Sequence, residues 1–176
     1  VLVRDPEKVD AMRLRELASW IEQARLIGGE DPEILSIETD SRRVEPGALF
    51  VALPGSRADG VQFAPEAVGR GARAVLAGRE VSGLPVPQIV ADEPRRAVGE
   101  AAAALYGRPS ERLSLIGVTG TNGKTTVAHL LAECLRAGGE TVGLLSTIRY
   151  DTGKHSVPAP LTTPDPVTLT RSLAEI

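Results

Sequence analysis

The sequence contains little cysteine, few aromatic residues, no large excess of one charge and no long apolar run. Only one of its 176 residues is a cysteine, which excludes an intramolecular disulfide and favours a reducing compartment. Aromatic residues make up 3% and the net charge is −3, so neither base stacking nor a basic surface favours a nucleic-acid partner. No apolar run approaches the roughly 18 residues that a membrane-spanning helix needs. We therefore expect a soluble, cytoplasmic protein without membrane insertion.

What the sequence does contain is a regular alternation of short apolar strands and amphipathic helices. Apolar residues make up 42%, which is enough for a core. Strands are expected at 34–39, 48–53, 74–77 and 88–91, and helices at 13–24, 63–70 and 95–106. Alternation of this kind indicates an α/β fold whose sheet is mainly parallel.

The stretch from Val118 to Thr126 (V-T-G-T-N-G-K-T-T) is the clearest functional signal. An apolar strand is expected just before it at 113–117, and a helix with one apolar face just after it. A strand, a glycine-bearing turn and a helix form a phosphate-binding loop, in which the first-turn N–H groups favour an anion. Lys124 can then reach the β- and γ-phosphates of ATP, and the Thr125 hydroxyl can bind Mg²⁺.

The loop departs from the common pattern G-x-x-x-x-G-K-[ST] at one position, because Val118 stands where the first glycine would be. What remains is G-x-x-G-K-T from Gly120 to Thr125. An ordinary strand–helix turn is the alternative interpretation, and the flanking strand and helix favour the phosphate site over it.

Beyond the loop, a strand is expected at 141–145, then a hairpin around Asp151-Thr152-Gly153 and a helix that Asp165 caps. We place the domain boundary at residues 92–93. Residues 1–92 then form an N-terminal domain, with 1–11 as a loose leader, and 93–176 form the first part of a P-loop domain. So few strands follow the loop that we expect the chain to be the front of a longer, truncated protein.

Three motifs in the same order resemble the Mur ligases, the ATP-dependent amide-forming enzymes of peptidoglycan precursor synthesis. Thr119–Thr126 is similar to their phosphate loop, T-G-[TS]-N-G-K-[TS], in which a glycine at position 118 is not required. Asp40-Ser41-Arg42, with 46–52 and 58–60, resembles their N-terminal UDP-binding domain. The segment 161–166 (L-T-T-P-D-P) is similar to the T-T-P-[DE] signature of the third ligase of the pathway, and the fourth ligase's G-N-x-N-N segment is absent from the sequence.

The resemblance implies two sets of binding residues and one catalytic residue, Lys124. The residues implied for ATP are Gly120, Thr121, Asn122, Gly123, Lys124, Thr125 and Thr126, with Thr125 also on Mg²⁺. Those implied for the UDP-MurNAc-dipeptide are Thr39, Ser41, Ser56, Arg57, Ala58, Thr162 and Thr163.

The implied reaction joins a diamino acid, meso-diaminopimelate or L-lysine, to UDP-MurNAc-L-Ala-D-Glu through an acyl phosphate, with ADP as a product. The enzyme is expected to be a monomer. The family's remaining catalytic and amino-acid-binding elements would lie beyond Ile176, so residues 1–176 alone are not expected to turn over. The alternatives are another Mur-type ligase, such as the one that makes the pentapeptide from the tripeptide, and a non-catalytic nucleotide-binding module.

Several of these residues could instead have only a structural role. Ser41 and Arg42 could form only a local turn, and Thr162-Thr163 could only cap the last helix. Cys134 is expected in the core, on the apolar face of the helix that follows the loop. One histidine in that helix and one in the hairpin make no metal cluster.

Overall fold

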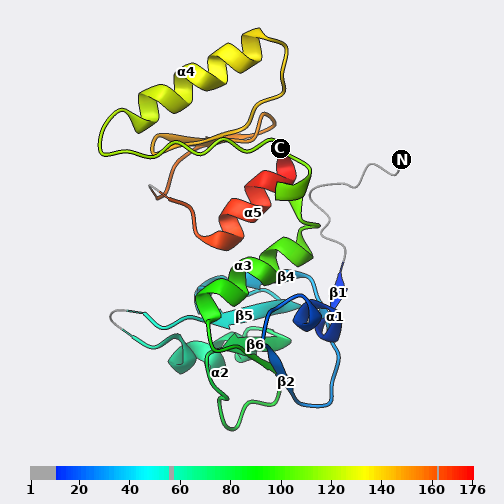
Figure 1. The fold of residues 1–176 in the computed structure, drawn as a ribbon. Helices are drawn as coiled ribbons and strands as arrows, with labels where there is room; N and C mark the ends of the chain where they lie inside the picture. The colour runs from blue at the N-terminus through cyan, green and yellow to red at the C-terminus, as the bar shows by residue number, and fades with distance from the viewer. Residues whose placement is uncertain (1–10, 56–57, 162) are drawn as a thin grey trace. The chain divides into compact units, whose positions relative to one another are not determined.

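The computed structural model describes residues 11–55, 58–161 and 163–176. They belong to two compact units, Val1–Gly107 and Arg108–Ile176 (Figure 1). The division falls after helix α3 (Pro94–Leu105), whereas the sequence placed the boundary before this helix. The reason is packing, since Ala97, Val98 and Ala101 of α3 are buried and the helix contacts the sheet of the first unit.

The first unit is built on a five-stranded sheet in the order β2-β7-β6-β5-β4. Its strands are β2 (Arg25–Ile27), β4 (Ser36–Glu38), β5 (Ala48–Ala52), β6 (Ala74–Ala77) and β7 (Gln88–Val90). The four strands from β4 to β7 pair in parallel, and β2 pairs with β7 in the antiparallel sense. The parallel sheet predicted from the alternation is thus confirmed, while the edge strand β2 was not expected.

Helices cover both faces of this sheet, which explains why β5 and β6 are apolar throughout and wholly buried. On one face Phe50 and Val75 pack with Ala64 and Ala67 of α2 (Ala64–Gly69). On the other, α3 contacts both β5 and β6, and it also contacts α1 (Leu14–Ser19). A separate antiparallel pair joins β1 (Met12–Arg13) to β3 (Glu33–Ile34).

Two short 3-10 helices shape the connections of the first unit. One, η1 (Ser41–Arg43), follows β4, and the other, η2 (Gly60–Phe63), precedes α2. The expected helix 13–24 is shorter in the structure, since α1 ends at Ser19 and Gln23 adopts a positive φ of 56°. The chain must turn there to reach β2.

The second unit contains helix α4 (Lys124–Ala137), a small sheet and helix α5 (Pro166–Glu175), preceded by a 3-10 turn η3 (Pro109–Glu111). The sheet is antiparallel, in the order β10-β9-β8. Its strands are β8 (Leu144–Leu145), β9 (Arg149–Asp151) and β10 (Ser156–Pro158). The predicted hairpin is therefore confirmed, and so is the Asp165 cap, whose carboxylate accepts hydrogen bonds from Val167 and Thr168 N–H.

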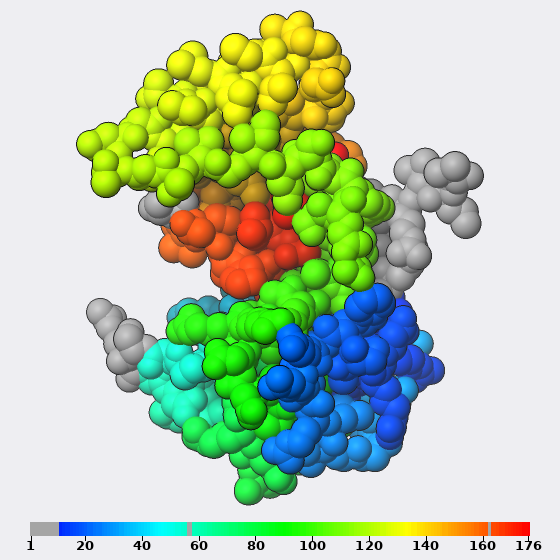
Figure 2. Space-filling view, viewed as in Figure 1, coloured from blue at the N-terminus to red at the C-terminus, as the bar shows by residue number. Residues whose placement is uncertain are grey.

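The strand expected at 113–117 is wrong, and so is the buried position expected for Cys134. In the described part of the chain residues 113–117 have no strand partner, and Leu115 and Ile116 are 54% and 60% exposed. Figure 2 shows α4, in yellow, on the surface of the second unit, where Val127, Leu130 and Cys134 are exposed. An apolar pattern leads to burial only where another element covers it, and none of the described residues covers these apolar side chains.

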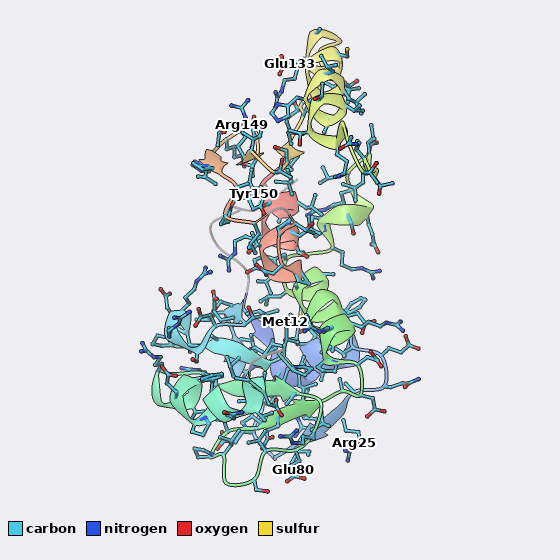
Figure 3. All side chains as sticks on the ribbon, turned by 90° about the vertical axis from the view of Figure 1, so that its left-hand side faces the viewer. Met12, Arg25, Glu80, Glu133, Arg149 and Tyr150 are labelled. Atoms are coloured by element: carbon cyan, nitrogen blue, oxygen red, sulfur yellow. The ribbon has the colours of Figure 1, made fainter. Side chains whose placement is uncertain are left out.

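Two side chains illustrate how β9 packs. Arg149 is exposed, whereas Tyr150 beside it is 4% exposed and its hydroxyl donates to the Leu161 carbonyl at 2.7 Å (Figure 3). This bond ties the hairpin to the segment that leads into α5.

Among the described residues, no helix is both long and apolar enough to cross a bilayer.

The turn after β4 is held by an internal ion pair. Asp40 caps η1 by accepting from the Arg42 N–H, and its two carboxylate oxygens accept from Arg42 Nε at 2.9 Å and Nη2 at 2.7 Å. The bonds from the guanidinium are the main reason why the pKa of Asp40 falls from 3.8 to about 2, and partial burial opposes them. The pair therefore favours the ionised form of Asp40 in the folded state.

We predict that Phe50→Ala lowers the free energy of unfolding of the first unit by about 3–5 kcal/mol, because it leaves a cavity beside α2. Phe63→Ala should cost less than about 1 kcal/mol, since Phe63 is 42% exposed. Urea unfolding followed by the fluorescence of Trp20, the single tryptophan, measures both. Equal losses in the two variants would contradict the packing described above.

We also predict that Asp40→Asn flattens the dependence of stability on acidic pH. A carboxylate with a lowered pKa stabilises the fold above its unfolded pKa near 4 and loses that contribution as the pH falls toward about 2. The melting temperature of the unsubstituted protein should therefore fall more steeply from pH 5 to pH 2 than that of the variant. Arg42→Ala, which keeps the carboxylate but removes its partner, should behave like Asp40→Asn, and parallel curves would argue against the mechanism.

Candidate functional site

The loop before α4 is shaped by two glycines with positive φ, Gly120 at 149° and Gly123 at 77°. Gly123 is the N-cap of α4 in the left-handed region, which a residue with a Cβ adopts only with strain. Because a glycine cap offers no side chain, nothing from that position satisfies the N–H groups of the first helical turn. These groups and the positive end of the helix dipole favour an anion in front of the loop.

Lys124 is folded back over this loop. Its Nζ donates to the Gly120 carbonyl at 2.5 Å and lies 3.4 Å from the Thr121 carbonyl oxygen. The ammonium group therefore lies against the carbonyls of the same loop that precedes the first turn of α4. A phosphate bound there would meet a positive charge and backbone donors together, which is the arrangement that nucleotide phosphates require.

Thr125, in the first turn of α4, has its hydroxyl 2.9 Å from the hydroxyl of Thr147, which follows β8. A hydroxyl engaged in one hydrogen bond keeps a lone pair, so Thr125 can still bind a hard cation. No cluster of three or more His, Cys, Asp or Glu side chains suited to a metal occurs among the described residues. This donor set fits Mg²⁺ held mainly by phosphates and water, as is usual for this ion at nucleotide sites.

In the first unit, the candidate residues follow the carboxyl ends of neighbouring parallel strands. Thr39 and Ser41 come after β4, and the loop 53–60 comes after β5. Because β4 and β5 run in parallel, both segments leave the sheet at the same edge. In open α/β sheets that edge is where ligands bind.

Ser41 is 6% exposed, and its hydroxyl donates to Glu66 Oε2 at 2.9 Å. Glu66 Oε1 in turn accepts from Nε of Arg70, the C-cap of α2, at 3.1 Å. Thr39, by contrast, is exposed. The structure thus joins Ser41 to a polar chain on α2 that hydrophobic periodicity does not reveal.

The loop 53–60 is closed on itself and braced from outside. Gly55 N–H donates to the Ala58 carbonyl at 3.1 Å, and Gly60 N–H donates to the Leu53 carbonyl at 3.0 Å. A Cβ at Gly60 would lie 2.5 Å from that carbonyl oxygen, so the two arms approach too closely for a larger residue. Ala58 is half-buried within the closed loop. Ser56 and Arg57 lie outside the described residues.

Two arginines from the same edge of the sheet hold this loop. Arg79, after β6, pairs with Asp59 at 2.9 Å, and Arg95, at the start of α3, donates to the Pro54 carbonyl at 2.8 Å. No motif of the sequence indicated a role for either arginine. Their placement after parallel strands is the signal that could have indicated them.

The last candidate pair is only partly described. Thr162 lies outside the described residues, and Thr163 is exposed, two residues before the cap of α5. The structure therefore brings Gly120, Lys124 and Thr125 together within the second unit. In the first unit it places Ser41 and the loop 53–60 at one edge of the sheet.

Family models match both units. The model described as "Mur ligase family, catalytic domain" matches residues 33–106, and "Mur ligase middle domain" matches residues 118–176. Curated relatives named UDP-N-acetylmuramoyl-L-alanyl-D-glutamate–2,6-diaminopimelate ligase include one of Bacteroides fragilis, 42% identical over 167 residues. Another, of Geobacillus thermodenitrificans, is 42% identical over 165 residues. Each alignment covers 94% of this chain but 34% of the relative, so the chain spans about a third of their length.

Solved structures agree with these relatives. A structure of a UDP-N-acetylmuramoyl-L-alanyl-D-glutamate–2,6-diaminopimelate ligase matches with a TM-score of 0.70 and 26% identity, covering 94% of this chain and 33% of that one. A MurF structure from Acinetobacter baumannii matches with a TM-score of 0.66 and 25% identity, covering 96% and 34%. With a family model on each unit and relatives aligned along nearly all of its length, the chain belongs to the Mur ligase family.

Proposed function

We propose that this chain is the N-terminal part of an ATP-dependent, ADP-forming ligase that adds 2,6-diaminopimelate to UDP-MurNAc-L-Ala-D-Glu. The observation that carries the proposal is the identity of about 42%, along 94% of the chain, to relatives with that name. The sequence motifs alone leave L-lysine open as the diamino acid, and the names of the relatives favour diaminopimelate. A cytoplasmic monomer that takes its substrates from solution is consistent with this role.

The second unit provides the ATP site. The loop from Gly120 to Thr126 holds the phosphates, and Lys124 lies against the terminal phosphate after leaving the carbonyls that it contacts here. Thr125 holds Mg²⁺, which supplies neutralisation of the phosphate charge. The support is geometric: backbone donors, a lysine and a free hydroxyl lone pair lie within one turn of a helix N-terminus.

The first unit provides the UDP site. Ser41, with the exposed Thr39 beside it, and Ala58 in its closed loop face the same edge of the sheet. Ser56 and Arg57 complete that loop in the proposal, and Thr162 with Thr163 contact the muramoyl-dipeptide. For Thr39, Ser41 and the loop 53–60 the support is their position after parallel strands, where α/β sheets bind ligands. Thr162 and Thr163 belong to the second unit, and their support is the T-T-P-D motif alone.

The reaction is transfer of the γ-phosphoryl group of ATP to the terminal carboxylate of the dipeptide, with ADP leaving. The amine of the diamino acid then attacks the acyl carbon, and the tetrahedral intermediate loses a proton and expels phosphate to form the amide. Lys124 serves both steps by stabilising charge on the transferred phosphoryl group. Positioning of the two substrates supplies most of the remaining acceleration.

The full-length protein tests this function directly. Phosphate release with UDP-MurNAc-L-Ala-D-Glu and ATP should require an amine, and meso-diaminopimelate should support it far better than L-lysine. Release with UDP-MurNAc-tripeptide and D-Ala-D-Ala instead would assign the chain to the pentapeptide-forming ligase. Nucleotide binding without any amine-dependent release would leave a binding module and overturn the ligase proposal.

Lys124→Ala should lower ATP-dependent turnover of the full-length protein by about 100-fold or more, because a charge that stabilises the transferred phosphoryl group is lost. Lys154→Ala is the matched control, since Lys154 is exposed in the turn between β9 and β10. Steady-state phosphate release should show normal turnover for the control. Turnover within a few-fold of normal in Lys124→Ala would remove the loop from the catalytic site.

A further inference from the structure

Thr147 is a polar residue outside every motif of the sequence, yet it contacts the phosphate loop. It lies two residues after the end of β8, and its Oγ1 is 2.9 Å from Oγ1 of Thr125. Thr147 is itself exposed, and Thr125 is half-buried. The contact therefore joins a surface hydroxyl to the residue proposed above to hold Mg²⁺.

The segment that carries Thr147 is anchored on both sides. Ser146 is 8% exposed, and its Oγ accepts from the N–H groups of Ile148 at 3.2 Å and Arg149 at 3.3 Å. The same Oγ lies 3.2 Å from Nε2 of His129, which is one turn beyond Thr125 on α4. Two successive turns of α4 thus contact two successive residues after β8, which limits the positions open to Thr147.

If the Thr125 hydroxyl binds a metal ion, its chemistry determines which of the two threonine hydroxyls donates the hydrogen bond. A threonine hydroxyl has one proton and two lone pairs, and it binds a cation through a lone pair. The proton must then point away from the cation and toward an acceptor. The hydroxyl oxygen of Thr147 is such an acceptor at hydrogen-bond distance, so it can hold the Thr125 proton away from the ion.

We propose that Thr147 is a positioning residue for the magnesium site: it accepts the Thr125 proton and so directs the Thr125 lone pair toward the ion. This inference rests on the proposed function, in which Thr125 holds Mg²⁺ beside the nucleotide phosphates. Thr147 touches neither the nucleotide nor the reacting atoms in this arrangement, and its effect reaches the ion through Thr125.

The test measures ADP binding to the full-length protein by titration calorimetry, with and without Mg²⁺. The quantity of interest is the gain in ADP affinity that Mg²⁺ produces. Thr147→Val keeps the shape of the side chain but removes the acceptor, and it should reduce this gain about tenfold while leaving Mg²⁺-free ADP binding unchanged. Thr147→Ser should restore the gain, because it restores the hydroxyl.

Two further variants separate positioning from folding. Thr170→Val removes a hydroxyl that donates to the Pro166 carbonyl within α5, and its Mg²⁺-dependent gain should be normal. Thr125→Val should abolish the gain, and adding Thr147→Val should change nothing more, since the two hydroxyls act as one unit.

Each other outcome has a distinct meaning. If Mg²⁺ still raised ADP affinity normally in Thr147→Val but not in Thr125→Val, the positioning role would be overturned. The ligase proposal would still stand. Equal loss of ADP affinity with and without Mg²⁺ in Thr147→Val would make the contact a structural one only. Absence of ADP binding in the unsubstituted protein would refute both the proposed function and this inference.

Discussion

The left-handed turn at Gly123 is the constraint on which the phosphate-binding chemistry proposed for the second unit depends. The turn lets α4 begin at Lys124 with its first N–H groups uncapped by any side chain of the preceding residue. It also sets Lys124 and Thr125 next to each other at the helix start, where one contacts the loop carbonyls and the other contacts Thr147. A residue with a Cβ at position 123 would strain this geometry, and the cation, the backbone donors and the hydroxyl would no longer converge.

The first unit also brings polar residues together at one place, and it does so through its parallel sheet. Its parallel strands β4, β5, β6 and β7 are held by helices on both faces, and the segments that follow them emerge at one edge. The contacts of Arg79 and Arg95 with the loop 53–60 are direct signs of that convergence. The buried sheet therefore positions the polar segments that follow its strands.

Exposed ion pairs and buried apolar side chains contribute differently to the stability of the first unit. The Asp40–Arg42 pair shapes a turn, and the exposure of the arginine, 77% for its side chain, keeps its energetic contribution small. Phe50 and Val75, by comparison, stabilise the first unit through burial against α2. The polar contacts at the edge of the sheet are thus better understood as fixing geometry than as sources of stability.

The sequence by itself determined the strands and helices whose pattern is local. The apolar strands β5, β6 and β7, the helices α2, α3 and α4, the hairpin and the Asp165 cap follow from periodicity, turn residues and capping chemistry. The loop proposed to bind phosphate was also recognisable in the sequence, because its glycines, lysine and threonine lie within six residues. The boundaries of α1 and the edge strand β2 could not be recognised in the sequence, since each depends on a partner that is distant in the sequence.

Only the tertiary structure decided which polar residues meet. Glu66 contacts Ser41 from a different helix, and Thr147 contacts Thr125 across 22 positions, distances that periodicity does not encode. Burial was also decided there: Leu115 and Ile116 are as apolar as the residues of β5, yet they are exposed because no described element covers them. A sequence states what a residue can bury or bind, and the packing of distant segments determines whether a partner is present.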